Sequence, residues 1–202
     1  MIAVIDYEMG NLKSVEKAFI KMGYDARVTD RISVVKDASA IVIPGVGAFP
    51  DAMDQLEKKG LIDIIQKQVS GGKPVLGICL GMQVMFDKGF EGAERKGLGL
   101  IPGTIQRIPA GVKIPHMGWN RLKIYRKSPV METIEDGTYA YFVHSYYATD
   151  VPEEYIAAVT DYGVTIPAIV QKDNVYGLQF HPEKSSEKGL QMIKNYGELS
   201  KC

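Results

Sequence analysis

The sequence predicts an α/β protein with a mixed, mainly parallel central sheet flanked by helices, and with a second, smaller antiparallel region. In the first half of the chain, short β-branched runs alternate with amphipathic stretches of helical spacing, which is typical of βαβ units. In the second half, residues 98–180, short strands follow one another between Gly and Pro turns. The 202 residues contain no linker long enough to separate domains, so we expect one domain over residues 1–202.

The elements expected in the first half follow from these patterns. The expected strands are residues 2–5, 25–29, 40–43 and 75–78. The expected helices are residues 12–22, residues 50–69 with a break near Gly60, and residues 80–87. In the first of these helices Leu12, Val15 and Phe19 recur at helical spacing, and Gly23 ends it. The strand–helix alternation therefore predicts a parallel sheet.

The second half is expected to contain six short strands and a final helix. The expected strands are residues 104–108, 121–125, 139–147, 155–160, 168–171 and 175–180. The helix is expected at residues 185–196, with Leu190 and Ile193 on its inner face. A mixed sheet with helices on its parallel portion is the simplest architecture that accommodates both halves.

Composition limits the function classes. Lys plus Arg number 24 and Asp plus Glu number 24, and this zero net charge argues against a nucleic-acid binder driven by a basic field. No apolar run approaches the roughly 18 to 20 residues that cross a bilayer, and residues 1–6 lack a basic leader. We therefore expect a cytoplasmic protein. Of the two cysteines, Cys202 is the last residue, so a disulfide is implausible and Cys79 should be a free thiol.

The most informative stretch is residues 74–83, Pro-Val-Leu-Gly-Ile-Cys-Leu-Gly-Met-Gln. It places Cys79 where an expected strand meets an expected helix, between Gly77 and Gly81. The serine version of this spacing is the nucleophile elbow of α/β-hydrolases, in which glycines leave room for a crowded backbone. A helix amino end favours thiolate over thiol, and the N–H of Leu80 could donate to an oxyanion. A lone cysteine is often only a small buried apolar residue, so the interpretation requires a partner base.

His181 is the candidate for that base. It follows an expected strand, and Pro182 biases it towards an extended conformation. In an extended segment residues two apart point the same way, so Glu183 could reach the His181 ring. A carboxylate bound to one ring nitrogen leaves the other to take the thiol proton. Taken alone, a strand-end histidine is often satisfied by a backbone carbonyl, and a glutamate is usually a surface carboxylate.

Two segments resemble the signature motifs of the class I (triad) glutamine amidotransferases. They are residues 77–83, Gly-Ile-Cys-Leu-Gly-Met-Gln, and residues 180–185, Phe-His-Pro-Glu-Lys-Ser. Further segments resemble one branch of that family, whose members pass ammonia to a cyclase subunit in histidine biosynthesis; these are residues 6–15, 44–49, 115–120 and 141–146. The resemblance covers essentially the whole chain and implies a flavodoxin-like, doubly wound fold.

The resemblance also implies an activity, the hydrolysis of glutamine to glutamate and ammonia. The implied catalytic triad is Cys79, His181 and Glu183. The implied oxyanion donors are backbone N–H groups of Leu80 and of residues 44–47, where Gly47 can reorient without a Cβ penalty. The implied contacts for glutamine are Gln83 and the backbone of Ser145 and Tyr146. His144 is then a neighbour in the strand rather than a catalyst.

A partner is implied as well, namely a cyclase subunit with a (β/α)₈ barrel that forms a heterodimer with this chain. The residues implied at the contact face are His116, Met117, Trp119 and Tyr141. The sequence contains neither a Walker motif nor Gly-x-Gly-x-x-Gly, which fits a partner that holds the phosphorylated substrate. We expect no metal, organic cofactor, nucleic acid or membrane contact.

Three alternatives remain open on the sequence alone. A glutaminase subunit of another amidotransferase would share both signature motifs. A cysteine hydrolase of the same fold, such as a peptidase, would share the elbow but need not carry His-Pro-Glu. A catalytically inactive binding or regulatory subunit is disfavoured by intact Cys79, His181 and Glu183.

Overall fold

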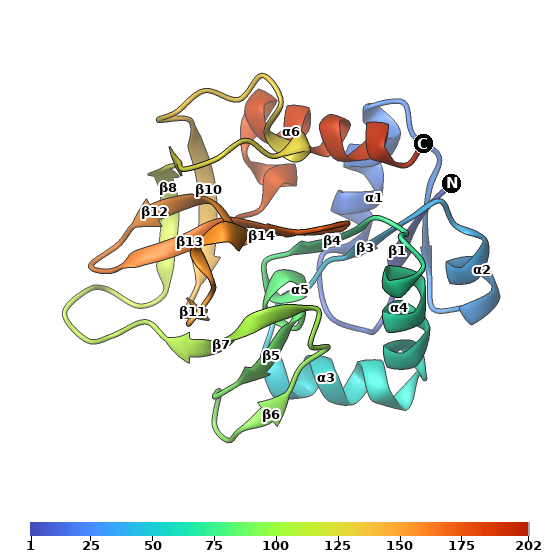
Figure 1. Ribbon diagram of the computed structural model, residues 1–202, viewed down its shortest axis with the longest axis horizontal. Helices are drawn as coiled ribbons and strands as arrows, with labels where there is room; N and C mark the ends of the chain where they lie inside the picture. The colour runs from blue at the N-terminus through green and yellow to red at the C-terminus, as the bar shows by residue number, and fades with distance from the viewer. Residues whose placement is uncertain (202) are drawn as a thin grey trace.

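A computed structural model describes residues 1–201, and Cys202 lies outside the described residues (Figure 1). Its central sheet has eight strands in the order β2-β1-β3-β4-β14-β13-β12-β9. Their bounds are β1 Ile2–Ile5, β2 Ala26–Thr29, β3 Ala40–Ile43, β4 Val75–Ile78, β9 Lys123–Ile124, β12 Ile156–Asp161, β13 Thr165–Lys172 and β14 Val175–Leu178. The strands from β2 to β14 pair in parallel, and β13, β12 and β9 add antiparallel. This confirms the predicted mixed, mainly parallel sheet.

Helices cover both faces of the sheet. They are α1 Leu12–Lys21, α2 Ile32–Asp37, α3 Phe49–Lys58, α4 Leu61–Ser70, α5 Leu80–Gln83 and α6 Ser186–Leu199. Figure 1 shows α1 and α6 on one side of the sheet, with α3 and α4 on the other. Successive side chains of a strand point to opposite faces of the sheet, so one strand contributes to both cores. Val42 packs in the core beneath α1 and α6, whereas Ile41 and Ile43 pack in the core beneath α2, α3 and α4. Among the described residues no helix is both long and apolar enough to cross a membrane.

Two smaller sheets account for the expected antiparallel region. One has the order β11-β7-β5-β6, and the other is the pair β10-β8. Their bounds are β5 Phe86–Gly89, β6 Arg95–Lys96, β7 Ile101–Arg107, β8 His116–Arg121, β10 Tyr139–His144 and β11 Tyr146–Thr149. Only β5 and β7 pair in parallel within these sheets. Single 3₁₀ turns occur at η1 Pro129–Met131, η2 Glu153–Tyr155 and η3 Pro182–Lys184.

The structure corrects several predicted boundaries. The helix expected at residues 80–87 ends at Gln83, because the chain turns and pairs as β5 from Phe86. The strand expected at 139–147 breaks at Ser145, and the two parts, β10 and β11, pair with different sheets.

Other elements were not predicted, or were predicted only in part. Helix α2 has six residues with Val35 as its one buried residue, too short for a helical period to show. The strand expected at 121–125 is two strands, of which β8 begins earlier, at His116. The start of β8 was missed because its Gly-Trp-Asn stretch, residues 118–120, lacks the alternation of apolar and polar residues that marks a strand.

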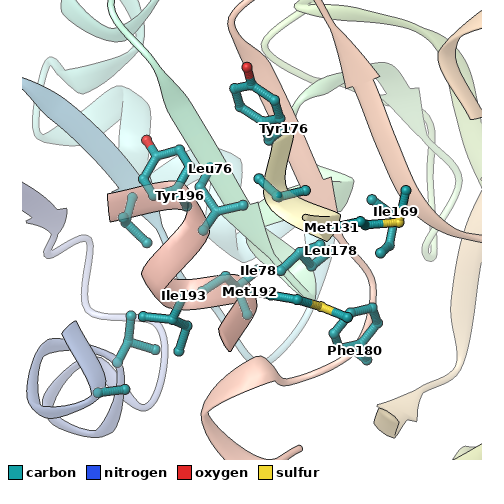
Figure 2. Close-up of a cluster of buried hydrophobic side chains, with 14 of the residues drawn as sticks. Leu76, Ile78, Met131, Ile169, Tyr176, Leu178, Phe180, Met192, Ile193 and Tyr196 are labelled. Atoms are coloured by element: carbon teal, nitrogen blue, oxygen red, sulfur yellow. The ribbon is translucent and has the colours of Figure 1, made fainter. Parts of the chain in front are cut away.

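Tyr196 closes the core on the α1 and α6 side of the sheet. Its ring lies against Tyr176 with centroids 6.0 Å apart, among the apolar side chains shown in Figure 2. Its hydroxyl is buried and donates towards the carbonyl oxygens of Ile41, at 2.7 Å, and Pro74, at 2.9 Å. The hydroxyl therefore ties α6 to the edges of β3 and β4.

Replacement of Tyr196 by Phe should lower the free energy of unfolding by about 1–3 kcal/mol, because it removes a buried hydroxyl that two carbonyl groups share. Urea unfolding followed by circular dichroism measures the change. Tyr176→Phe is the matched control, since that hydroxyl makes no hydrogen bond to residues 1–201, and its effect should stay within about 0.5 kcal/mol. Equal effects of the two substitutions would contradict the assigned role of the Tyr196 hydroxyl.

Candidate active site

Cys79 lies in the sharp turn between β4 and α5. Its backbone has φ 55° and ψ −112°, a left-handed conformation that costs an ordinary side chain of order 1–3 kcal/mol. The N–H of Cys79 donates to the carbonyl oxygen of Leu178 on β14 at 2.8 Å. The surrounding strands therefore hold the predicted elbow in place despite its strain.

Two glycines are required by the packing around this turn. A Cβ at Gly81 would lie 1.7 Å from the carbonyl oxygen of Ile43 on β3. A Cβ at Gly77 would lie 2.5 Å from the carbonyl oxygen of Gly81. Contacts this short cannot be relieved by side-chain movement, since each involves backbone atoms. The Gly-x-Cys-x-Gly spacing thus reflects close approach of α5 to β3 and β4.

His181 and Glu183 form a buried pair. His181 follows β14, and its Nδ1 lies 2.9 Å from Oε1 of Glu183, with the two side chains 3% and 2% exposed. Glu183 lies in the 3₁₀ turn η3, so the turn returns the carboxylate to the ring, and the expected extended segment ends at His181. Ser185 fixes this turn by donating to the His181 carbonyl oxygen at 2.6 Å and accepting from the Tyr141 N–H at 2.9 Å.

The imidazole of His181 interacts with the Cys79 thiol as well as with Glu183. Burial lowers the pKa of His181, but the Cys79 thiol and the Glu183 carboxylate outweigh burial and raise it to about 9. The Nε2 atom of His181 is buried and makes no hydrogen bond within residues 1–201. The sulfur itself lies 3.7 Å from the carbonyl oxygen of Val143. Nε2 is therefore the ring atom that can exchange a proton with the sulfur.

A cavity of about 300 Å³ opens at the sulfur of Cys79. The sequence-predicted residues that line it with Cys79 are Gly47, Leu80, Gln83, Ser145 and Tyr146. The Nε2 group of Gln83 donates to the carbonyl oxygen of Tyr146 at 2.8 Å and to Oε1 of Gln179 at 3.1 Å. The structure therefore brings together the residues that the sequence predicted as nucleophile, base, orienting carboxylate and glutamine pocket.

The backbone donor expected at Leu80 is engaged in this structure. Its N–H donates to the carbonyl oxygen of Gly45 at 3.3 Å, within the segment 44–47 that was expected to supply the second donor. The hydroxyl of Tyr7 holds the same segment by donating to the Pro44 carbonyl oxygen at 2.5 Å. Gly47 has φ 120°, a conformation open to glycine. While this bond is made, the Leu80 N–H does not donate into the cavity.

The family profile described as "Glutamine amidotransferase class-I" matches residues 3–197. The chain belongs to this family. A relative from Caldanaerobacter subterraneus subsp. tengcongensis, named "Imidazole glycerol phosphate synthase subunit HisH", is 51% identical over 202 residues that make up all of both chains. A relative of the same name from Desulfitobacterium hafniense (strain DSM 10664 / DCB-2) is 53% identical over 198 residues, covering 98% of this chain and 94% of its own.

Solved structures agree with the fold. A glutamine amidotransferase crystal structure aligns with a TM-score of 0.79 at 18% identity, over all of both chains. A chain from the structure of PurLQS from Thermotoga maritima aligns with a TM-score of 0.76 at 20% identity, over 98% of this chain and 95% of its own. At these identities the likeness extends to the fold of the class-I amidotransferases and no further.

The residues predicted at a partner face divide into two groups. Met117 and Trp119 on β8 are 62% and 53% exposed, and Trp119 packs edge-on against the half-buried Tyr141 with ring centroids 6.0 Å apart. His116 is only 2% exposed, because its ring is stacked between Phe142 and Tyr162. The side chain of His116 therefore does not join Met117 and Trp119 on the exposed surface, and its expected place at a partner contact stays a prediction.

Sequence reasoning missed Glu91, which lines the cavity. Its Oε2 accepts the backbone N–H of Phe49 at 2.7 Å, which fixes a carboxylate at the cavity wall. Glu91 lies between β5 and β6, in a loop without any local motif, so no sequence signal identifies it. Within residues 1–201 no three His, Cys, Asp or Glu side chains are grouped to hold a metal ion.

Replacement of Glu183 by Gln should lower the pKa of His181 below about 9, because the carboxylate is one of the two groups that raise it. Since the folded pKa of His181 exceeds the unfolded value of about 6.5, the raised pKa adds to the free energy of unfolding. This contribution is fully present below pH 6.5 and is lost as the pH rises through about 9. The difference in free energy of unfolding between wild type and variant should therefore shrink from pH 6.5 to about 9. NMR titration of the imidazole and urea unfolding measure the two effects.

The matched control for this substitution is Glu187→Gln, which neutralises an exposed carboxylate in the first turn of α6. It should leave the titration midpoint of His181 unchanged. An unchanged midpoint in Glu183→Gln would contradict the role assigned to the buried pair.

Proposed function

We propose that this chain is the glutaminase subunit of imidazole glycerol phosphate synthase in histidine biosynthesis, with residues 1–202 as one glutamine amidotransferase domain. The carrying observation is the strained Cys79 beside the His181–Glu183 pair, at the end of a cavity lined by the predicted pocket residues. Identity of 51% along the full length of a relative named as that subunit supports the choice within the family.

The proposed reaction proceeds through a thioester. His181 takes the proton of Cys79, and the sulfur attacks the side-chain carbonyl carbon of glutamine. N–H groups of Leu80 and Gly47 receive the oxyanion once residues 44–47 have turned. His181 then returns the proton to the departing nitrogen, which leaves as ammonia. Water, deprotonated by the same imidazole, cleaves the thioester and releases glutamate and the free thiol.

Glutamine fits the chemistry of the cavity walls. The cavity volume of about 300 Å³ lies at the small end of the range for ligand sites, which suits a ligand as small as an amino acid. Glu91 offers a carboxylate to the α-ammonium group, and the backbone at Ser145 and Tyr146 offers polar groups to the rest of the amino-acid head. The side-chain amide then extends towards Cys79.

The proposed partner is a cyclase subunit with a (β/α)₈ barrel that forms a heterodimer with this chain and receives the ammonia. Exposed Met117 and Trp119, with Tyr141 beside them, supply the apolar and aromatic contacts that interfaces favour. There the ammonia would yield imidazole glycerol phosphate and aminoimidazole carboxamide ribotide. We place the reaction in the cytoplasm, whose reducing conditions keep a nucleophilic thiol free.

Replacement of Cys79 by Ala should lower glutamine-dependent synthesis by the complex at least about a thousandfold, because the attacking atom is lost. Synthesis by the variant complex from added ammonium salts should remain within a few-fold of the wild-type rate. This ammonium-dependent rate also serves as the control for folding and assembly. The assay follows imidazole glycerol phosphate and glutamate. Glutaminase activity that yields a different product with the native partner would instead identify another amidotransferase, and cleavage of a peptide panel would identify a hydrolase.

The isolated chain should hydrolyse glutamine slowly, because the N–H of Leu80 is donated to Gly45 and is unavailable to an oxyanion. Assembly with the cyclase subunit and its nucleotide substrate should raise glutamate release at least about a hundredfold, the scale of one oxyanion donor. A coupled glutamate assay on the isolated chain and on the complex measures this. Equal rates in the two would refute control through residues 44–47.

A further inference from the structure

Two buried histidines outside the proposed triad are joined by hydrogen bonds that run from β8 to the cavity wall. Asn120 Nδ2 lies 3.2 Å from Nε2 of His116, and Nδ1 of His116 lies 2.9 Å from Nε2 of His144. Nδ1 of His144 lies 2.9 Å from the carbonyl oxygen of Tyr146. The proposed reaction uses neither histidine.

The direction of every proton in this chain of bonds is determined. The Tyr146 carbonyl can only accept, so Nδ1 of His144 carries a hydrogen and, in the neutral ring, Nε2 accepts. His116 must then donate from Nδ1 and accept at Nε2 from the Asn120 amide. The orientation of that amide is fixed independently, since its oxygen accepts from the Arg121 N–H at 2.8 Å and its nitrogen donates to the Asp161 carbonyl at 3.0 Å.

This pattern requires both rings to be neutral, and their surroundings make them so. Burial lowers the pKa of His116 to about 4. Burial is also the largest effect on His144, whose pKa is lowered to about 3. Stacking of His116 on Phe142 and Tyr162, with ring centroids 4.7 and 4.0 Å away, fixes its ring plane.

The Tyr146 carbonyl, at the end of this chain of hydrogen bonds, also determines how Gln83 faces the cavity. That carbonyl oxygen of Tyr146 accepts from Nε2 of Gln83, and the second hydrogen of Nε2 goes to Oε1 of Gln179. Both amide hydrogens of Gln83 are thereby used, which leaves Oε1 as the free acceptor of a side chain that lines the cavity. Displacement of the Tyr146 carbonyl would free the Gln83 amide to turn.

We infer that His144 and His116 are positioning residues for glutamine binding: they hold the Tyr146 carbonyl so that Gln83 presents Oε1 to the N–H donors of the substrate. This inference rests on the proposed glutaminase function and assigns roles to two residues that it leaves without one. This chain of hydrogen bonds begins at Asn120 and His116 on β8, the strand that also carries the exposed Met117 and Trp119. The same bonds therefore connect the exposed side chains of β8 to the cavity.

The test is a double-mutant cycle between His144 and Gln83 in the assembled, nucleotide-bound complex. His144→Phe should raise the KM for glutamine about tenfold, the scale of one buried hydrogen bond, and change kcat less than about threefold. In a Gln83→Ala background the same substitution should raise KM less than about twofold, because the residue through which it acts is gone. A general packing defect would lower kcat and act equally in both backgrounds.

Two further variants keep the test decisive if His144→Phe folds poorly. His144→Asn retains an amide N–H near the position of Nδ1, so KM should return to within about threefold of wild type. His116→Phe preserves the stacking between Phe142 and Tyr162 but removes both ring nitrogens; it should raise KM about threefold, again only when Gln83 is present. Thermal unfolding of each variant checks its fold.

Additive effects on KM, or a fall in kcat with KM unchanged, would overturn the positioning role while the glutaminase function stood. A wild-type complex that released no glutamate from glutamine would overturn the proposed function, and the inference with it. The two failures are therefore separated by the wild-type rate alone.

Discussion

The rest of the site depends on the strained backbone turn at Cys79. A left-handed φ is held there by close packing, with Gly81 pressed against the Ile43 carbonyl and Cys79 N–H bound to Leu178. The strain is balanced by contacts that β3 and β14 make from either side. As a result Cys79, directly after β4, lines the cavity.

Strand order explains how the base reaches this sulfur. Strands β4 and β14 are parallel neighbours, with Ile78 opposite Leu178, although one closes the first half of the chain and the other comes near its end. Cys79 follows the first strand directly, and His181 follows the second after a few residues. Both therefore emerge at the carboxyl edge of the sheet, which is where ligands of open α/β sheets commonly bind. The η3 turn then brings Glu183 to the far side of the ring.

Local sequence signals predicted much of this arrangement. Alternating strands and helices predict the parallel half of the sheet. The Gly-x-Cys-x-Gly spacing identifies the elbow because a Cβ at either glycine would collide with nearby backbone atoms. The likeness of residues 77–83 and 180–185 to one family then linked the cysteine to its distant base.

Other features depend on contacts between residues remote in sequence, which no local pattern encodes. The break at Ser145 arises because β10 and β11 have partners in different sheets. Burial of His116 is set by Phe142 and Tyr162, and the place of Glu91 by the N–H of Phe49. The engagement of the Leu80 N–H by the Gly45 carbonyl likewise joins two segments that are remote in sequence.

The pairing of β4 with β14 has a consequence for how this protein can be controlled. Neighbouring strands of a sheet lie about 4.8 Å apart and cannot separate without breaking their ladder, so the ends of β4 and β14, which Cys79 and His181 follow, keep a fixed spacing. A change that moved the two strand ends apart would have to break this ladder. Adjustment of the site is therefore left to the segments outside the sheet that line the cavity, among them Val46 and Gly47.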